Sequence, residues 1–283
     1  MASFSLPPTV PATPELMRAL LPPAGGEKFP LWPAGTTPPG ESAPAPERGE
    51  YWTVTGIAEP YPHGAHLNLF NVWQPEIEIF PAKRANAGDT TAAVLIAPGG
   101  CYQFLSWTLE GVELARWLNS FGVTAAVLKY RVPTRSGATP GEMELKDAQR
   151  ALALLRANAA KWGIDPLRVG MLGFSAGAHL SALAGNAPAR AYDAVDAADA
   201  QNVRPDFTVL MYPAYLAGEG ALAPLTPTAR TAPAIFIHAA DDPFTVESSL
   251  QYFAALRAAG VSAEMHIYAA GGHGYGIRPT SYP

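Results

Sequence analysis

Six short apolar runs, separated by longer segments with helical periodicity, most constrain what this chain can fold into. Apolar runs of four to eight residues are typical of strands buried on both faces, and strands that alternate with helices form parallel sheets. In the longest helical segment, Leu145, Ala148 and Leu152 recur at spacings of three and four and predict one apolar face. The sequence therefore predicts a doubly wound α/β fold, with a mostly parallel sheet and helices on both of its faces. We expect strands at 92–97, 123–130, 169–172, 207–212, 234–238 and 263–268, and helices at 109–121, 141–162, 175–184 and 246–259.

The first fifty residues have a different composition. They hold 12 of the 29 prolines, which disfavours regular structure, so we expect an irregular arm with one short helix at 14–21. The segments 51–55 and 76–80 alternate in polarity like strands, and they predict an antiparallel edge on the larger sheet. We therefore divide the chain into an N-terminal arm, 1–50, and an α/β domain, 51–283.

Charge and composition exclude several classes of protein. With 48% hydrophobic and 15% charged residues, the 283-residue chain is globular rather than disordered. A net charge of −5 offers no basic surface for nucleic acid, and no apolar run reaches the roughly 18 residues of a membrane span. We expect neither nucleic acid nor a membrane as a partner.

The sequence does not decide the cellular compartment of the protein. The single cysteine, Cys101, cannot form an internal disulfide, so cysteine usage does not decide it. No Lys or Arg precedes Arg18, and prolines interrupt the N-terminus, so this chain shows no secretory signal. The two alternatives are a cytoplasmic protein and a secreted one whose leader has been removed.

One pentapeptide carries a candidate nucleophile. Gly173-Phe174-Ser175-Ala176-Gly177 has the form G-x-S-x-G and lies between a predicted buried strand and a predicted helix. Small residues on both sides of a serine permit a sharp turn that projects its hydroxyl from a helix N-terminus. This context predicts that Ser175 is a catalytic nucleophile.

A serine hydroxyl needs an imidazole as base and a carboxylate to orient that imidazole. Two later predicted strands supply them, because Asp242 and His273 each follow the end of a strand. Asp241 is the alternative acid, although Asp242 directly precedes Pro243 and is thereby biased toward extended backbone. The order Ser175, Asp242, His273 is that of the α/β-hydrolases.

A glycine-containing loop follows the predicted strand 92–97 and reads Pro98-Gly99-Gly100-Cys101-Tyr102. The hydrolase fold places at this point the backbone N–H groups that stabilise the oxyanion of the reaction. We expect the N–H groups of Gly100 and Cys101, together with that of Ala176 after the nucleophile, to form the oxyanion hole.

The chain resembles the α/β-hydrolase carbohydrate esterases that include bacterial acetylxylan esterases and xylan deacetylases. The resemblance rests on APGGCYQFLSWTLEG, LNSFGVTAAVLKYRVP, KDAQRALALLRANAAKWGIDPLRVGMLGFSAGAHLSA, IFIHAADDPFTVESS and GGHGYG, between Ala97 and Gly276. It implies that 51–283 is the catalytic domain of a serine esterase that uses no metal or cofactor and removes acetyl groups from xylan-type or short acetylated sugars. Cys101 departs from the family's usual third glycine, and relatives usually carry a further helix after the last motif. The exposed apolar surface that this leaves keeps a homo-oligomer open as an alternative.

Other residues near the predicted site have more than one interpretation. Tyr102, Trp107 and Tyr275 adjoin its loops, and we assign them as substrate-binding residues that stack on a sugar, with a pocket wall as the alternative. His238 ends a predicted buried strand and is interpreted as a core histidine or a neighbour of the catalytic residues. His63 and His66 form an H-x-x-H pattern in a Pro/Gly loop, which we do not interpret as a metal site.

Three functions therefore remain. The first is deacetylation of a small-molecule or polysaccharide ester through an acyl-enzyme. The second is a general short-chain carboxylesterase or feruloyl esterase, because the same triad serves both. The third is a carbohydrate-binding relative without catalytic activity.

Overall fold

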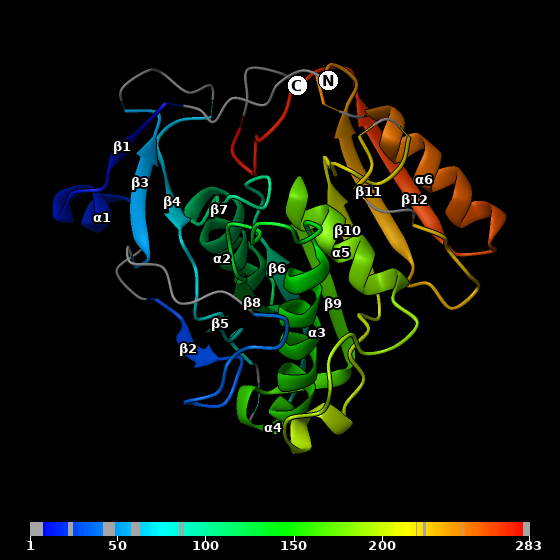
Figure 1. Ribbon diagram of the computed structural model, residues 1–283, viewed down its shortest axis with the longest axis horizontal. Coiled ribbons are helices and arrows are strands. Elements are labelled where there is room, and N and C mark those ends of the chain that lie inside the picture. The colour runs from blue at the N-terminus through cyan, green and yellow to red at the C-terminus, as the bar shows by residue number, and fades with distance from the viewer. Residues whose placement is uncertain are drawn as a thin grey trace.

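The centre of the computed structural model is an eight-stranded sheet (Figure 1). The structure describes residues 8–21, 25–41, 49–57, 63–84, 86, 88–218, 220–222, 225–244 and 246–279. The sheet has the order β12-β11-β10-β9-β6-β8-β5-β2, in which β5 and β2 each run antiparallel to the preceding strand and all other neighbours are parallel. Its strands are β2 (Glu27–Pro30), β5 (Glu76–Phe80), β6 (Thr91–Ala97), β8 (Thr124–Lys129), β9 (Ile164–Phe174), β10 (Thr208–Met211), β11 (Ala234–Ala239) and β12 (Ala263–Tyr268).

This sheet confirms the predicted α/β-hydrolase fold, since all six apolar runs are strands in its parallel part. The central strands are buried because helices cover both of their faces. β8 is buried at every residue, and so are the last five residues of β6. Continuous apolar sequence is therefore needed at these strands, where alternation would place polar groups in the core.

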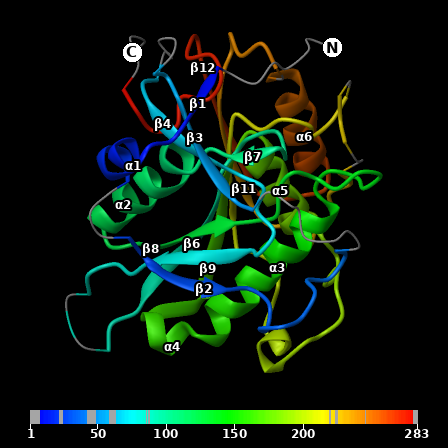
Figure 2. The ribbon, with the colours of Figure 1, turned by 60° about the vertical axis from the view of Figure 1, so that its left-hand side comes forward.

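The helices pack on both faces (Figure 2). α2 (Glu113–Ser120) lies on one face of the sheet, whereas α3 (Glu142–Ala157) and α5 (Ala176–Asn186) lie on the other. α6 (Val246–Ala258) joins the α5 side, where Tyr252 and Leu256 share a hydrophobic cluster with Ala178 and Ala182. The shorter helical elements are α1 (Pro14–Leu20), the π-helix η1 (Thr108–Val112), α4 (Ala159–Trp162) and the 3₁₀ helix η2 (Ala197–Ala200).

The N-terminal segment is more ordered than the sequence predicts. The short helix α1 is present, and Thr13 caps its N-terminus as a hydrogen-bond acceptor for the Leu16 N–H. A strand, β2, then pairs with β5 and forms one edge of the main sheet, so the arm is not irregular throughout. β5 lies at this antiparallel edge as predicted. The predicted strand 51–55 instead joins a separate antiparallel sheet of order β1-β3-β4-β7, made of β1 (Thr9–Pro11), β3 (Tyr51–Thr55), β4 (His66–Phe70) and β7 (Phe104–Leu105).

Buried contacts join this N-terminal segment to α3. Leu31 and Trp32 belong to the main hydrophobic core. The Trp32 indole N–H donates to the Asp147 carboxylate at 2.9 Å, and the Arg150 guanidinium donates to the Leu31 carbonyl at 2.8 Å. Both Asp147 and Arg150 are buried. Residues before 51 thus help to complete the core.

Among the described residues, no helix is both long enough and apolar enough to cross a bilayer.

Candidate active site

The G-x-S-x-G pentapeptide forms a tight turn between β9 and α5. Ser175 lies at this turn with φ 51° and ψ −117°, a conformation that L-residues rarely adopt. A Cβ on Gly173 would lie 2.0 Å from the Gly177 carbonyl oxygen, and one on Gly177 would lie 2.0 Å from that of Ala97. Glycine is therefore required at both positions, which explains why the sequence pattern predicts the turn.

The structure brings Ser175, His273 and Asp242 together at the carboxyl ends of the strands. The His273 Nε2 lies 2.9 Å from the Ser175 hydroxyl oxygen, and its Nδ1 lies 2.7 Å from Asp242 Oδ2. In the arrangement that satisfies all three groups, the Ser175 hydroxyl donates to Nε2 while the Nδ1–H donates to Asp242. Such a chain allows a histidine to take the serine proton as the serine attacks.

Asp242 accepts three hydrogen bonds. Besides His273, its Oδ2 accepts from the Nε2–H of His238 at 2.9 Å, and its Oδ1 accepts from the Phe244 backbone N–H at 2.8 Å. His238 is fully buried, and its Nδ1 accepts from the Ser249 hydroxyl at 3.0 Å. His238 therefore lies directly behind the acid, which is one of the two positions that the sequence left open for it.

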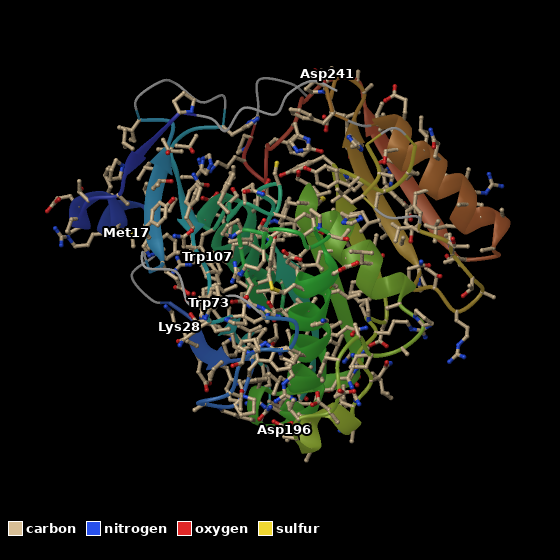
Figure 3. All side chains as sticks on the ribbon, in the orientation of Figure 1. Met17, Lys28, Trp73, Trp107, Asp196 and Asp241 are labelled. Carbon is tan, nitrogen blue, oxygen red and sulfur yellow. The ribbon has the colours of Figure 1, made fainter. Side chains whose placement is uncertain are left out.

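The alternative acid, Asp241, has a different environment. It is exposed at the rim of the sheet (Figure 3), and its Oδ1 accepts from the Gly272 backbone N–H at 2.8 Å. It therefore holds the loop that carries His273, whereas Asp242 contacts the imidazole. The geometry favours Asp242 as the orienting acid.

The protonation of Asp242 predicts a pH dependence of stability. Burial disfavours its charge, but hydrogen bonds from His238 and His273 outweigh burial and lower its pKa to about 2. Because the unfolded value is about 3.9, this carboxylate stabilises the fold by on the order of 2 kcal/mol above pH 4, and the contribution is lost as the pH falls through 2. Urea unfolding of the wild type and Asp242→Asn should therefore give a stability difference at pH 5 that shrinks at pH 2. A difference that stays constant over this range would contradict the assignment.

The glycine-containing loop lies beside the nucleophile. A Cβ on Gly99 would be 3.0 Å from the Ser175 Cβ, so only glycine allows this approach. Within the described part of the chain, no backbone hydrogen bond uses the N–H groups of Gly100, Cys101 or Ala176. These three donors, which the sequence assigns to the oxyanion hole, are thus available to a ligand. Cys101 is half-buried, and burial raises the pKa of its thiol to about 11, so the thiol is neutral near pH 7.

Two of the three predicted sugar-stacking residues are buried, and their assignment is corrected. Tyr102 has no exposed surface, and its hydroxyl shares a 2.8 Å hydrogen bond with Nδ1 of His179 in the core. Trp107 (Figure 3) is 3% exposed and lies edge-on to Trp52 of the smaller sheet. Neither ring presents a face to solvent. Tyr275 is half-buried, with its ring centroid 4.5 Å from that of Tyr212, and remains a candidate for substrate contact.

The described residues contain no group of three His, Cys, Asp or Glu side chains that could hold a metal ion. His66 of the H-x-x-H pattern is buried in β4, where its Nδ1 lies 3.1 Å from the Gly64 carbonyl oxygen. Burial lowers the pKa of His66 to about 4.

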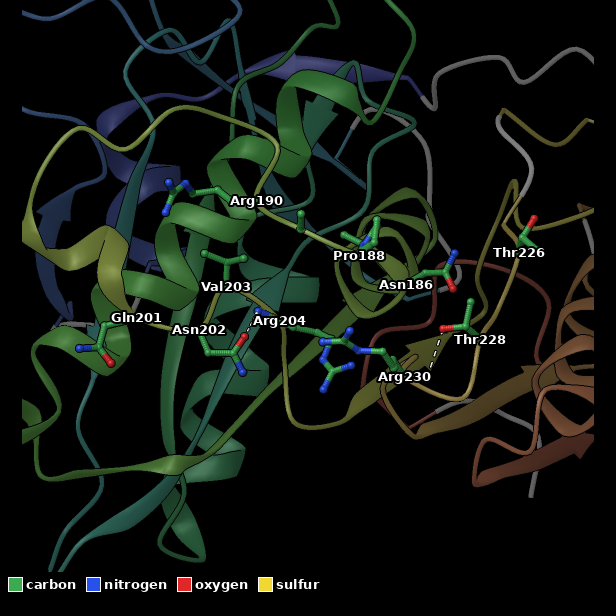
Figure 4. A pocket seen from close by; sticks show the side chains of 12 residues that line it. Asn186, Pro188, Arg190, Gln201, Asn202, Val203, Arg204, Thr226, Thr228 and Arg230 are labelled. Carbon is green, nitrogen blue, oxygen red and sulfur yellow. Dashed lines mark hydrogen bonds between the residues drawn. The ribbon is translucent and has the colours of Figure 1, made fainter.

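A cavity of about 660 Å³ lies at the opposite end of the sheet from Ser175 (Figure 4). Its walls come from residues that follow α5 and from those that precede β10 and β11, so it lies at the amino ends of these strands. It is therefore separate from the candidate active site. The side chains that line it include Asn186, Arg190, Asn202, Arg204, Thr228 and Arg230.

Comparison with known proteins identifies esterases. The model of the BD-FAE family matches residues 83–209, which include the glycine-containing loop and Ser175. An acetylxylan esterase of Xylanibacter ruminicola is 31% identical over 212 residues, or 65% of this chain, and Esterase LipQ of Mycobacterium tuberculosis is 30% identical over 44% of it. The chain spans 41% and 27% of the lengths of these two relatives.

The solved structures that resemble this chain are also those of esterases and hydrolases. An acetyl ester-xyloside bifunctional hydrolase from Caldicellulosiruptor lactoaceticus is 29% identical, with a TM-score of 0.67 and 89% of each chain covered. Esterase 2 of Thermogutta terrifontis shares the fold, with a TM-score of 0.63 at 23% identity over 71% of this chain and 81% of its own. These findings confirm the resemblance to α/β-hydrolase esterases that the sequence motifs indicate.

Proposed function

Since this chain is an α/β-hydrolase related to bacterial esterases, we propose that it is a serine esterase that removes acetyl groups from carbohydrates of the xylan type or from short acetylated sugars. The observation that carries the proposal is the continuous contact from Ser175 through His273 to Asp242. A hydrogen-bonded serine, imidazole and carboxylate are the parts that acyl transfer needs.

In the proposed mechanism, the Ser175 oxygen attacks the ester carbonyl while His273 Nε2 takes the serine proton. Asp242 holds the imidazole through Nδ1–H and stabilises its positive charge. The N–H groups of Gly100, Cys101 and Ala176 stabilise the oxyanion, and collapse of the intermediate breaks the bond to the sugar oxygen, which takes the proton from His273. Water, activated by His273, then hydrolyses the acetyl-serine and releases acetate.

Two observations support a small acyl group on a carbohydrate. The relatives include an acetylxylan esterase and an acetyl ester-xyloside hydrolase. The segment between β10 and β11, where a lid would lie, forms no helix or strand in its described residues, 212–218, 220–222 and 225–233. A site without a helical lid offers little apolar surface to a long acyl chain.

The test compares acyl chains and sugars. We expect kcat/KM for p-nitrophenyl octanoate to be no higher than that for the acetate, because added methylenes gain no burial at this site. Acetate should also be released from acetylated xylan or cellobiose acetate. A preference for octanoate, or release of ferulate without release of acetate, would contradict the proposal.

A general short-chain carboxylesterase is the second candidate, because Esterase LipQ is also similar in sequence, at 30% identity over 44% of this chain. Hydrolysis of p-nitrophenyl acetate with no release of acetate from any acetylated sugar would favour it. A fluorophosphonate probe separates both enzymes from a carbohydrate-binding relative without activity, since the probe labels only an activated serine.

A further inference from the structure

A buried glutamate lies behind the loop of the oxyanion hole. Glu110 is 4% exposed and occupies the middle of the π-helix η1, an irregularity that is frequent at functional sites. Its Oε2 accepts from the Gly99 backbone N–H at 2.8 Å, and its Oε1 accepts from the Tyr212 hydroxyl at 2.8 Å. The carboxylate therefore links the loop beside Ser175 to the end of β10.

Tyr212 extends this link to the loop of His273. The Tyr212 hydroxyl accepts from the Gly276 backbone N–H at 2.9 Å, three residues after His273. The Tyr212 ring lies edge-on to the imidazole, with a centroid distance of 5.0 Å. The Gly99 N–H and the Tyr212 hydroxyl both donate to Glu110. Both carboxylate oxygens therefore act as acceptors, as in an ionised carboxylate.

The negative charge of Glu110 has no lysine or arginine partner. Among the described residues, no lysine or arginine side chain forms an ion pair with it, and positive charge on His273 favours its ionised form. Burial raises the pKa of Glu110, whereas hydrogen bonds from Tyr212 and Gly99 oppose that rise. A buried carboxylate without a permanent counter-ion is costly to maintain, so its location behind Tyr212, whose ring contacts the imidazole, calls for a functional reason.

We propose that Glu110 is a positioning residue of the esterase site. It fixes the glycine-containing loop relative to the His273 loop. Its charge also stabilises the imidazolium that forms when His273 takes the serine proton. This inference rests on the proposed function. Two carboxylates then act on one imidazole, with Asp242 in direct contact and Glu110 acting across Tyr212.

The other titratable groups around His273 belong to three elements. Asp242 follows β11 and contacts Nδ1 directly, and His238 acts only through Asp242. His63 contacts the backbone of His273, and burial lowers its pKa, so it is neutral in the alkaline range. Tyr212 follows β10 and stays protonated because burial raises its pKa. Asp241 also lies near this loop, but it is exposed and accepts from the Gly272 backbone N–H. Among the described residues, Glu110 is thus the second buried carboxylate near the imidazole, after Asp242.

The test is Glu110→Gln, which keeps the shape but removes the charge and places an amide where two donors point. We expect kcat to fall on the order of 10²-fold with KM nearly unchanged, because a displaced oxyanion donor affects the transition state alone. Without the charge, the acidic limb of the pH profile of kcat/KM should move down by on the order of 0.5 pH unit. The matched control is Glu264→Gln on β12, at an exposed carboxylate, which should leave both quantities unchanged.

The position of the acidic limb separates this role from simple packing. A lower kcat with an unmoved limb would overturn the electrostatic part of the proposal, and a wild-type kcat would overturn all of it. If Glu110→Gln does not fold, Tyr212→Phe tests the same link while keeping the carboxylate. It should lower kcat about tenfold, and a wild-type rate in this variant would overturn the proposal.

Labelling by a fluorophosphonate at several pH values distinguishes this inference from the proposed function. If wild-type Ser175 does not react, the proposed function fails. If the wild type reacts and Glu110→Gln reacts at the same rate with the same pH dependence, the inference about Glu110 fails alone.

Discussion

Ser175→Ala should lower kcat for p-nitrophenyl acetate on the order of 10⁶-fold, the largest effect expected from any single substitution in this chain. The hydroxyl supplies the nucleophile, and the other parts of the site can accelerate attack by water only weakly in its absence. The change removes one oxygen atom from a side chain that is 6% exposed. It leaves the backbone strain at this turn unchanged, because alanine and serine both tolerate φ 51° poorly.

We therefore expect the melting temperature of Ser175→Ala to stay within a few degrees of the wild type, so that the loss of activity reports chemistry rather than unfolding. The variant should also fail to react with a fluorophosphonate. Hydrolysis within tenfold of the wild-type rate would eliminate the serine mechanism.

Asp242→Asn should lower kcat on the order of 10⁴-fold. Asp242 accepts from both imidazoles through Oδ2 and from the Phe244 N–H through Oδ1, whereas an asparagine has only one acceptor oxygen. An asparagine whose oxygen accepts from the Phe244 N–H turns its amide N–H group toward His273. His273 then adopts the tautomer with its proton on Nε2, which cannot accept the serine proton.

Asp241→Asn is the matched control, at the neighbouring carboxylate, which accepts from the Gly272 N–H. It should lower kcat less than about tenfold, since an amide oxygen can still accept that bond. A larger loss from Asp241→Asn than from Asp242→Asn would reassign the acid. The two variants are best compared at pH 7 to 8, far above the pKa of about 2 that the hydrogen bonds to Asp242 produce.

The parts of the fold that depend on local sequence could be predicted from it. Buried parallel strands need continuous apolar residues, and the sharp turn at Ser175 needs glycine at 173 and 177, so both leave a clear pattern. Ser175, Asp242 and His273 each follow a predicted strand, and parallel strands bring their carboxyl ends to one edge. Topology alone was therefore enough to expect their contact.

The parts that depend on tertiary packing could not be predicted. Tyr102 and Trp107 adjoin the glycine-containing loop in sequence, but Trp52 of β3 packs against Trp107, and α5 supplies the histidine that bonds Tyr102. Glu110 was overlooked because a lone glutamate in a predicted helix normally faces solvent. Its partners, Gly99 and Tyr212, lie on two other segments of the chain, and only the folded structure brings them to Glu110.

The position of β2 has a consequence for how the chain acquires its structure. Among the strands of the main sheet, β2 is the first in the sequence and forms one edge, and β12 is the last and forms the other edge. A nascent chain that emerges from the ribosome can therefore assemble β6, β8 and β9 first and must add its earliest and latest strands to opposite sides. The contacts of Leu31 and Trp32, which follow β2, with α3 can form only after more than a hundred further residues have been synthesised. Until then, the apolar surface of these residues is a natural target for chaperones.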